Sequence, residues 1–519
     1  MRKVLTIISF FVSPMMLLAQ EDWSRQDKLD WKDADFAFYQ GDYTFAKLLL
    51  EDLQKKHADH LGVQFELGAS YVMLGTNITV AKEMLEKAKF EGNSEAIFYL
   101  ARANHQLYHF EKSLTLYSQY QSLEDKEQTT EKVEKWIKEA RLAQHLTSNP
   151  IDVKVKNLGP TINGPFKEYV PIVTPDNKQL YFTSRRPEST GGLKDQNNEF
   201  FEDIFESRKV GNEWKQAAPA VGDLNTKTHD ATVSISKDGM QMIVYRTNQN
   251  LTGGDLYISE KKEGKWGKPK LLNKRINTSY QEASACFGAD NNTIYFSSNR
   301  PGGFGGKDLY RVVKLPNGEW SLPKNLGPTI NTTYDEDAPY MDIDGSTLYF
   351  ASNGHETIGG YDIFYTRKVG REVWKQPENL GYPVNTVFDD LFLSLDAGGR
   401  IGYYSSDQQG GFGLQDIYQV DFIYRQQTEI IILGTVLDAE SQPIHATLTV
   451  MNETNREVQG VYKSHMGSGK FILVLNPLIQ YRIVIKADGY KTIVNELMLP
   501  FPEDNYEEQR IAPYIMLAE

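Results

Sequence analysis

Cysteine is almost absent from this chain, because Cys286 is the single thiol in 519 residues. One thiol cannot form an intramolecular disulfide, and no cysteine stands near the N-terminus to carry a lipid. Cys286 lies in a repeated segment, at a position where we expect a buried strand residue. Long apolar runs are also missing outside the N-terminus, so we expect no transmembrane segment once that terminal run is removed.

Signatures of catalysis and metal binding are missing too. The nine histidines form no HExxH arrangement, no GxSxG elbow is present, and Cys286 has no histidine close in sequence. Asp342 and Asp344 resemble the start of a calcium loop, but Asn353 stands where the last ligand of that loop would be glutamate. We therefore expect a protein that is not an enzyme and that needs no cofactor and no metal.

An excess of basic residues is the third absence. The chain has 56 Lys and Arg against 69 Asp and Glu, a formal net charge of −13. Removing Arg2 and Lys3 with a signal peptide leaves 54 basic against 69 acidic residues, a charge of −15. Nucleic acid is therefore not an expected partner.

The N-terminus has the pattern of a secretory signal peptide over residues 1–19. Met1-Arg2-Lys3 supplies the charged part, and Val4 to Ala19 is almost free of polar residues. The pattern predicts export. An uncleaved membrane anchor is the alternative, although the run is short for a span and lacks a stop-transfer flank.

A cassette of about fifty residues recurs five times in the middle of the chain. Each copy opens with an asparagine, and an acid follows five residues later. The asparagines are Asn163, Asn225, Asn277, Asn331 and Asn385, and the acids are Glu168, Asp230, Glu282, Glu336 and Asp390. A strand-like aromatic run, a glycine-rich turn and a second aspartate complete each copy, and these aspartates are Asp203, Asp255, Asp308, Asp362 and Asp416.

A period of 52 to 54 residues built from short strands predicts a β-propeller over residues 149–425. We predict five blades, with six as the alternative. The fifth cassette lacks an outer strand, whereas a strand-like segment, Ile151–Gly159, precedes the first cassette. We expect this segment to complete the fifth blade, so that the ring has no open edge.

The five acids at one register allow two interpretations. They could form an acidic ring at the mouth of a central channel that holds a cation or a cationic peptide. Alternatively, each carboxylate accepts hydrogen bonds from backbone amides of the next blade. Symmetry favours this structural role, because chemistry needs different groups in one place. The second aspartates are expected to bond their own turns.

One cassette departs from the repeat. The first copy alone carries an insertion, Pro187–Phe201, that contains Lys194 and Asp195. Binding residues lie more often in such irregular loops than in the repeated scaffold. We therefore predict a partner contact at Lys194 and Asp195.

Residues 20–148 have helical spacing rich in Ala, Leu, Glu, Lys and Gln. Gly41, Gly75 and Tyr108 are 34 and 33 residues apart, and small residues stand where paired helices would cross. This pattern resembles the tetratricopeptide repeat, and we expect a solenoid of three helix pairs with a capping helix around 131–145. The resemblance implies a groove that holds a peptide or a partner's segment, and a spacer without a ligand is the alternative.

Residues 428–519 contain short alternating strands, including Glu429–Asp438, Gly469–Leu475 and Tyr481–Lys486. They resemble the carboxypeptidase regulatory-like domain, which implies a transthyretin-like β-sandwich that serves as a spacer or an adhesive module. The repeated Ser298-Asn-Arg-Pro-Gly-Gly303 and Asp308-Leu-Tyr310 resemble the WD40-like PD40 repeat of TolB-type propellers.

The order of these modules is similar to PorE-like envelope proteins of Bacteroidetes. That resemblance implies a periplasmic protein, peripheral to the outer membrane and linked to type IX secretion, gliding or surface-adhesin anchoring. In that family an OmpA-like peptidoglycan-binding domain usually follows, but this sequence ends at Glu519. Direct attachment to the wall is therefore not carried over, and any peptidoglycan association would be indirect.

The leading hypothesis is a non-enzymatic scaffold or adaptor. Its expected partners are envelope proteins, such as an outer-membrane barrel and secretion or gliding components. The alternative is a saccharide-binding or saccharide-cleaving propeller, which would require an asymmetric pair of carboxylates. A sensor that passes an envelope signal through the helical solenoid is a third reading.

Overall fold

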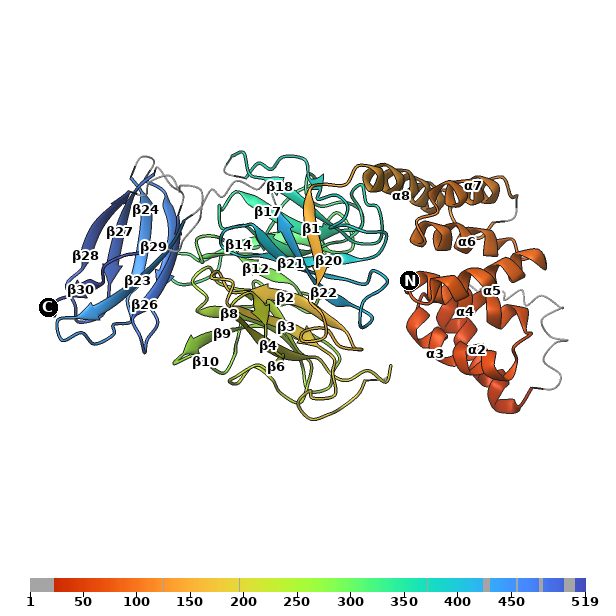
Figure 1. Cartoon of the computed structure of the whole chain (residues 1–519), viewed down its shortest axis with the longest axis horizontal. Coiled ribbons are helices and arrows are strands. Elements are labelled where there is room, and N and C mark those ends of the chain that lie inside the picture. Colours follow the sequence, from red (N-terminus) through yellow and green to blue (C-terminus); the bar gives the residue numbers. More distant parts are fainter. Residues whose placement is uncertain are drawn as a thin grey trace, which may run out of the picture. The chain divides into compact units, whose positions relative to one another are not determined.

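The computed structural model describes residues 23–124, 126–195, 197–370, 372–422, 430–453, 456–475, 479–498 and 509–519. The predicted signal peptide, residues 1–19, lies outside them. The chain divides into two compact units, 1–144 and 145–519. The first contains helices, and the second consists of antiparallel sheets with one short parallel edge (Figure 1).

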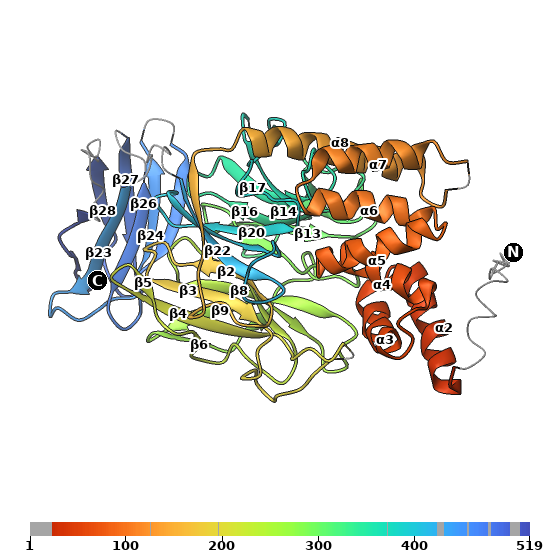
Figure 2. The same ribbon diagram turned by 45° about the vertical axis from the view of Figure 1, so that its right-hand side comes forward.

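The helical unit contains three successive helix pairs, which stack in chain order (Figure 2). These pairs are α2 (Arg25–Tyr39) with α3 (Tyr43–Lys56), α4 (Leu61–Met73) with α5 (Ile78–Phe90), and α6 (Glu95–Gln106) with α7 (Phe110–Gln121). A last helix, α8 (Thr130–Ser148), packs on α6, where the Phe98 and Trp136 rings stack with centroids 4.4 Å apart. The prediction of paired helices followed by a capping helix is confirmed.

The turns inside the pairs explain the sequence period. Gly41, Gly75 and Tyr108 all have left-handed backbone, with φ of 80°, 67° and 60°. Glycine adopts this conformation at little cost, whereas Tyr108 is an unusual residue for it. Gly68 lets α4 and α5 approach closely, because a Cβ there would lie 3.1 Å from Leu85.

Five antiparallel sheets follow, and each is built from strands that are consecutive in the chain, except that the last takes its outer strand from the start. The first four sheets are β2 (Glu168–Val173), β3 (Gln179–Ser184), β4 (Asp203–Val210), β5 (Glu213–Trp214) and β6 (Ala218–Pro219); β7 (Asp230–Ile235), β8 (Gln241–Thr247), β9 (Gly254–Lys262), β10 (Lys265–Trp266) and β11 (Lys270–Leu271); β12 (Ala285–Phe287), β13 (Thr293–Ser298), β14 (Asp308–Val313) and β15 (Lys324–Asn325); and β16 (Glu336–Met341), β17 (Thr347–Ser352), β18 (Asp362–Arg367) and β19 (Glu378–Asn379).

The fifth sheet closes a ring. It contains β20 (Asp390–Leu395), β21 (Ile401–Ser406) and β22 (Asp416–Phe422), and its outer strand is β1 (Val153–Asn157). The first strands contact one another in the cyclic order β2, β7, β12, β16, β20 and back to β2. The predicted pairing of segment 151–159 with the last cassette is therefore confirmed, with Val153 opposite Phe422.

The C-terminal strands form two further sheets around one apolar core. One contains β23 (Ile430–Asp438), β26 (Lys470–Leu475), β29 (Gln509–Arg510) and β30 (Tyr514–Met516), and the other β24 (Thr447–Asn452), β25 (Val458–Lys463), β27 (Gln480–Lys486) and β28 (Ile493–Met498). The Asn291 side chain donates to the Val461 carbonyl at 3.0 Å, which ties these sheets to the ring.

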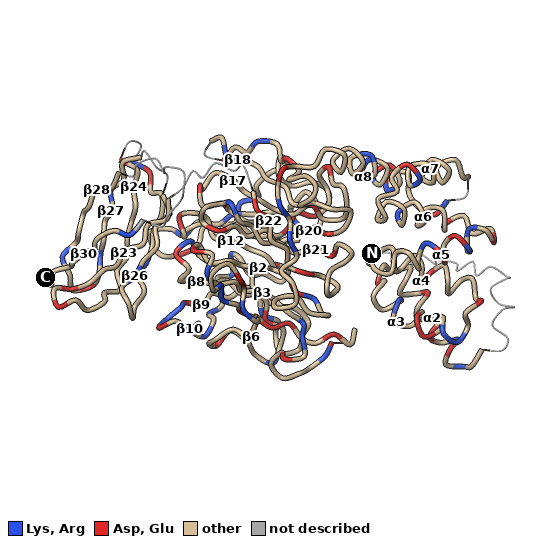
Figure 3. The backbone as a smooth tube through the Cα atoms, viewed as in Figure 1, with Lys and Arg blue, Asp and Glu red and all other residues tan. Residues whose placement is uncertain are grey.

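Charged residues of both signs are interspersed along both units (Figure 3). Among the helices of the described residues, none is both long enough and apolar enough to cross a membrane.

Candidate functional site

The repeated asparagine of each cassette joins neighbouring sheets. Its side-chain oxygen accepts from a backbone amide of the preceding sheet, and its side-chain nitrogen donates to the carbonyl of the same residue. The pairs are Asn163 with Ile417, Asn225 with Ile204, Asn277 with Leu256, Asn331 with Leu309 and Asn385 with Ile363, at 2.8–3.1 Å. The side-chain amide of each asparagine thus makes the same two hydrogen bonds that a backbone residue makes with its partner in an antiparallel strand pair.

The five repeated acids are 0–2% exposed and hold the connection that leads into their own strand. Each carboxylate accepts from the amide four residues earlier, at 2.5–2.8 Å; the donors are Gly164, Thr226, Thr278, Thr332 and Thr386. The expectation that these amides belong to the next blade is wrong. A carboxylate reaches its own connection because the chain turns back between asparagine and acid, and the asparagine makes the link between sheets.

A basic side chain completes this arrangement in three sheets. Arg186, Arg246 and Arg300 each bind the acid of their cassette and the carbonyl that precedes its asparagine. In the fourth sheet the His355 ring bonds the equivalent carbonyl, of Ile330, at 2.8 Å. In the fifth sheet, Gln408 occupies the sequence position that corresponds to Arg186 and Arg300. Burial raises the pKa of the repeated acid of this sheet, Asp390, to about 8.

Four of the five second aspartates accept from backbone amides of their turns, as predicted, and among them Asp203 accepts from the Thr190 amide. Asp308 accepts from the amides of Phe304 and Gly305, and Asp416 accepts from those of Phe412 and Gly413. Asp362 accepts from Ile358 in the same way. These carboxylates are structural acceptors within their turns.

The inner strands enclose a cavity of about 240 Å³ on the axis of the ring. All five sheets line it, mainly with apolar residues such as Ile172, Ala285 and Leu393. A bulge interrupts four of the inner strands, and three bulge residues have left-handed backbone, namely Val170, Ala338 and Phe392 with φ of 50°, 49° and 60°. Backbone strain of this kind often accompanies a functional site.

None of the five repeated acids lines this cavity, so the acidic ring as a binding site stays a prediction. Glu202 and Asp337 line it instead. Sequence reasoning missed Glu202. It indicates Asp337 only as part of the acidic run 335–337, a weak metal candidate for which a solvated turn is the favoured reading, whereas Asp337 is buried.

Glu202 is the centre of an ion-pair network at the end of the insertion. Arg185 donates to Glu202 at 3.0 Å, to Asp195 at 2.7 Å and to Glu199 at 2.9 Å. Burial alone would raise the pKa of Glu202, but hydrogen bonds from His229 and Tyr169 and the charge of Arg185 hold it at about 2. The carboxylate therefore stays ionised.

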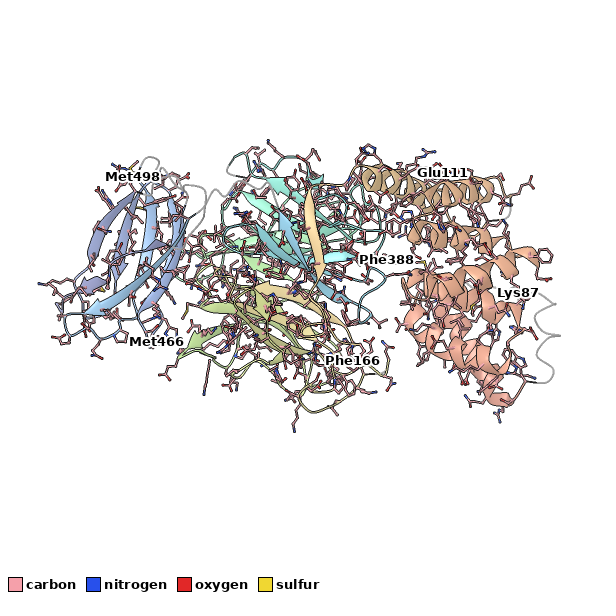
Figure 4. The ribbon with its side chains drawn as sticks, viewed as in Figure 1. Lys87, Glu111, Phe166, Phe388, Met466 and Met498 are labelled. Atoms are coloured by element: carbon pink, nitrogen blue, oxygen red, sulfur yellow. The ribbon has the colours of Figure 1, made fainter. Side chains whose placement is uncertain are left out.

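The insertion is fixed to the ring through this network. Of the two residues predicted to contact a partner, Asp195 is bound by Arg185, whereas Lys194 is exposed and lies over the Phe200 ring at 4.6 Å. Phe200 also packs against Phe166, with centroids 6.1 Å apart. Phe166 lies in the connection before β2 (Figure 4). The two residues thus lie together on a supported loop, and their role as a partner contact stays a prediction.

Asp337 is held in a similar way. Lys307 donates to it at 2.7 Å, and the Ser284 hydroxyl also donates to it. Burial opposes the charge, yet Lys307 and these hydrogen bonds lower the pKa of Asp337 below its ordinary value. Both carboxylates that line the cavity are therefore charged and paired.

Lys237 and Cys286 also line the cavity. The Lys237 ammonium donates to the Met341 carbonyl at 2.5 Å and lies 4.5 Å from the centre of the Tyr340 ring. Burial raises the pKa of Cys286 to about 12, so the thiol is protonated and unreactive, as its predicted burial implies. Within the described ranges, no group of three His, Cys, Asp or Glu side chains could hold a metal ion.

No protein-family model and no curated protein matches the chain. Solved structures give remote likenesses. A putative TolB from Agrobacterium tumefaciens is 14% identical, covers 62% of this chain and 97% of its own, and has a TM-score of 0.31. A thermostable family-43 glycoside hydrolase is 12% identical over 51% of this chain and 91% of its own, with a TM-score of 0.35. An alpha-L-arabinofuranosidase from Lactobacillus brevis is 13% identical, with the same coverage and a TM-score of 0.33. At these identities and TM-scores, the likenesses assign no function to the chain.

Proposed function

We propose that this protein is a non-enzymatic adaptor of the cell envelope. In this proposal residues 149–425 form a five-bladed PD40-type propeller, and residues 428–519 form a transthyretin-like sandwich. The protein is exported to the periplasm, lies peripheral to the outer membrane, and serves type IX secretion, gliding or the anchoring of surface adhesins.

One observation carries the non-enzymatic part of this proposal. Glycoside cleavage needs one carboxylic acid that stays protonated and a second that is ionised. Glu202 and Asp337 both line the cavity, and ion pairs lower the pKa of both. Neither is therefore suited to protonate a leaving group.

The adaptor part rests on the presence of two units with separate cores. Helical repeat units commonly use an extended face for binding, and irregular loops on a repeated β scaffold do the same. Here the helical unit has its own core, and the ring carries the insertion 187–201 on one sheet only. The two units thus offer two binding surfaces for different envelope proteins.

The test is capture of partners from the native envelope. The tagged full chain would be cross-linked in living cells and purified, and its partners identified by mass spectrometry. A Lys194→Glu variant would test the insertion, and Lys265→Glu, equally exposed on β10, is the matched control. We expect outer-membrane, secretion or gliding components with the wild type and the control, and fewer of them with Lys194→Glu.

Recovery of no envelope protein above a tag-only control would contradict the adaptor proposal. If the wild type, Lys194→Glu and Lys265→Glu recover envelope proteins equally, the adaptor proposal stands, but the insertion is not the site of contact.

The cavity favours a second candidate, a saccharide-binding propeller. Tyr169, Tyr245 and Tyr340 line it together with the two charged carboxylates, and aromatic rings with fixed polar groups are common in sugar sites. Binding of a glycan array to the purified protein, lost on Tyr245→Ala, would support this candidate.

A further inference from the structure

Lys237 crosses the interior of the ring. It lies in the turn between β7 and β8 of the second sheet, where its backbone amide donates to the Asn291 side chain at 3.1 Å. Its ammonium donates to the Met341 carbonyl at the end of β16, in the fourth sheet. The second and fourth sheets are not neighbours, because the third lies between them. The side chain therefore places its charge inside the ring, where Lys237 lines the cavity on the axis.

The Lys237 ammonium has no opposite charge paired with it. Lys237 is 7% exposed, and its ammonium has one hydrogen-bond acceptor in the described structure, the Met341 carbonyl, while the centre of the Tyr340 ring lies 4.5 Å away. In the part of the chain that the structure describes, no carboxylate forms an ion pair with this ammonium. Burial lowers the pKa of Lys237, and the charges of Asp342 and Asp344 only partly oppose this effect. A buried cation without a paired anion costs free energy, which an anionic ligand would recover.

The other charged groups of the cavity lining already have charged partners. Glu202 accepts from Arg185 at 3.0 Å, and Asp337 accepts from Lys307 at 2.7 Å. Lys237 is thus the one charged side chain of the described lining that is left without an opposite charge.

The rest of the cavity favours a hydrocarbon chain. Its apolar walls include Ile172, Ile235, Ala285, Leu393 and Leu395. Two of its hydroxyl groups are used within the protein, because Thr232 donates to the Val170 carbonyl at 2.8 Å and Tyr340 donates to the Leu395 carbonyl at 3.1 Å. The cavity of about 240 Å³ is larger than an engineered cavity of about 150 Å³ that holds benzene. A ligand of about six to eight carbon atoms is therefore of suitable size.

We propose that the cavity on the axis of the ring binds a small aliphatic carboxylate. The carboxylate group accepts hydrogen bonds from the Lys237 ammonium, and the hydrocarbon chain lies against the apolar walls. An inorganic anion would leave those walls without a contact, and a neutral alcohol would leave the ammonium without an opposite charge. The inference goes beyond the adaptor function and does not depend on it. It assigns to the cavity a ligand other than the saccharide considered above.

The test compares three probes on the purified full-length protein by isothermal titration calorimetry. Hexanoate carries both parts of the ligand, n-hexanol has the same chain without the charge, and acetate has the charge without the chain. Lys237→Met removes the ammonium and keeps an apolar side chain of similar length. Lys261→Met is the matched control. The Lys261 ammonium likewise contacts a hydroxyl, of Tyr181 at 3.0 Å, and a ring, of Trp266 at 5.2 Å, but Lys261 does not line the cavity.

We expect hexanoate to bind the wild type at least about tenfold more tightly than n-hexanol or acetate, because the hydrogen bond between ionised groups and the burial of the chain both contribute. Lys237→Met should bind hexanoate no more tightly than n-hexanol, whereas Lys261→Met should keep the wild-type preference. Equal binding of hexanoate and n-hexanol to the wild type, or no binding of hexanoate, would overturn the inference. So would a preference for hexanoate that Lys237→Met retains.

A folding defect is recognised separately. Lys237→Met replaces a buried unpaired charge by an apolar group, so the variant should be at least as stable as the wild type in thermal denaturation. If the variant does not fold, hexanoate should still raise the melting temperature of the wild type more than n-hexanol does at the same concentration, and equal effects would contradict the proposal. A glycan that binds the cavity while hexanoate does not would favour the saccharide candidate and overturn this inference. Capture of envelope proteins should be the same for the wild type and Lys237→Met, so failure of the adaptor proposal would leave this inference standing.

Discussion

Buried carboxylates occur in both units, but the two units treat them differently. In the ring, an acid recurs at one register in every sheet and accepts a backbone amide each time. In the helical unit, Asp35 and Glu66 occur once, and Glu66 keeps an oxygen without a donor. The repeated acids complete the fold of the ring, whereas the second oxygen of Glu66 has no such bond to the backbone in the described structure.

The largest effect should follow from breaking the best-paired acid. Arg185→Met leaves Glu202 buried without its guanidinium, and such a loss destabilises a protein by about 3–5 kcal/mol. Chemical denaturation of the ring measures it. Arg311→Met is the control, because Arg311 pairs at 2.8 Å with Glu372, whose side chain is 40% exposed, and exposed pairs contribute about 1 kcal/mol or less. A similar small loss for both variants would contradict the network.

A repeated acid should matter less than this network but still be structural. Glu282 accepts from the Thr278 amide at 2.8 Å and from Arg300 at 3.2 Å. Glu282→Gln places a donor among these donors and should cost about 1–3 kcal/mol. Glu213→Gln, at a side chain 83% exposed, should cost almost nothing in the same denaturation measurement. Unchanged stability with lost partner capture would instead support a functional acidic ring.

In the fifth sheet, a substitution that supplies the missing basic partner should stabilise the protein. Gln408→Arg gives Asp390 the guanidinium that three other sheets have, and should stabilise the protein by about 1–2 kcal/mol at neutral pH. In the wild type, the folded protein keeps the Asp390 proton up to about pH 8, whereas an unfolded aspartate releases it near 3.8. Stability should therefore fall as pH rises between these values.

The decrease in stability with rising pH should be smaller in Gln408→Arg than in the wild type, because the guanidinium favours the charged form of Asp390. Denaturation measured across that pH range checks the prediction. Two parallel stability curves for wild type and variant would show that residue 408 does not reach Asp390.

The smallest effect concerns Glu66 of the helical unit. Glu66→Gln replaces a buried carboxyl, whose ionisation burial opposes, by an amide that stays neutral, and should raise the free energy of unfolding of the helical unit by about 0.5–1 kcal/mol. The folded pKa of Glu66 lies well above its ordinary value of 4.5, so wild-type stability should fall as pH rises above 4.5, and the variant should lose less. Thermal denaturation followed by helical circular dichroism measures both, with Glu83→Gln, at an exposed position on α5, as the control that keeps the wild-type slope.

Much of the fold could be predicted from the sequence, because repetition averages out local ambiguity. The five cassettes gave the sheets, and the surplus strand-like segment before Asn163 gave the closing strand β1. The spacing of Gly41, Gly75 and Tyr108 likewise located the turns of the helix pairs. Each of these elements depends on local backbone preference and on alternation, both of which a single sequence shows.

The cavity could not be predicted in the same way. The bulges at Val170, Ala338 and Phe392 shift which side chains of the inner strands face the axis, and simple alternation does not contain that shift. Glu202, which lines the cavity, directly follows the insertion in the chain, and its partner Arg185 precedes that insertion. The Asp35–Glu66 pair depends on how α2 and α4 pack, since the two residues are 31 positions apart.

The closing strand has a mechanical consequence. In the chain, β1 follows the helical unit and β22 precedes the C-terminal strands, so a pull transmitted along the chain at both points acts on the β1–β22 pair. The strands are antiparallel, and Val153 lies opposite Phe422, so both points of load are at the same end of the pair. Tension applied at these two points therefore separates the strands one residue pair at a time instead of shearing all five pairs together.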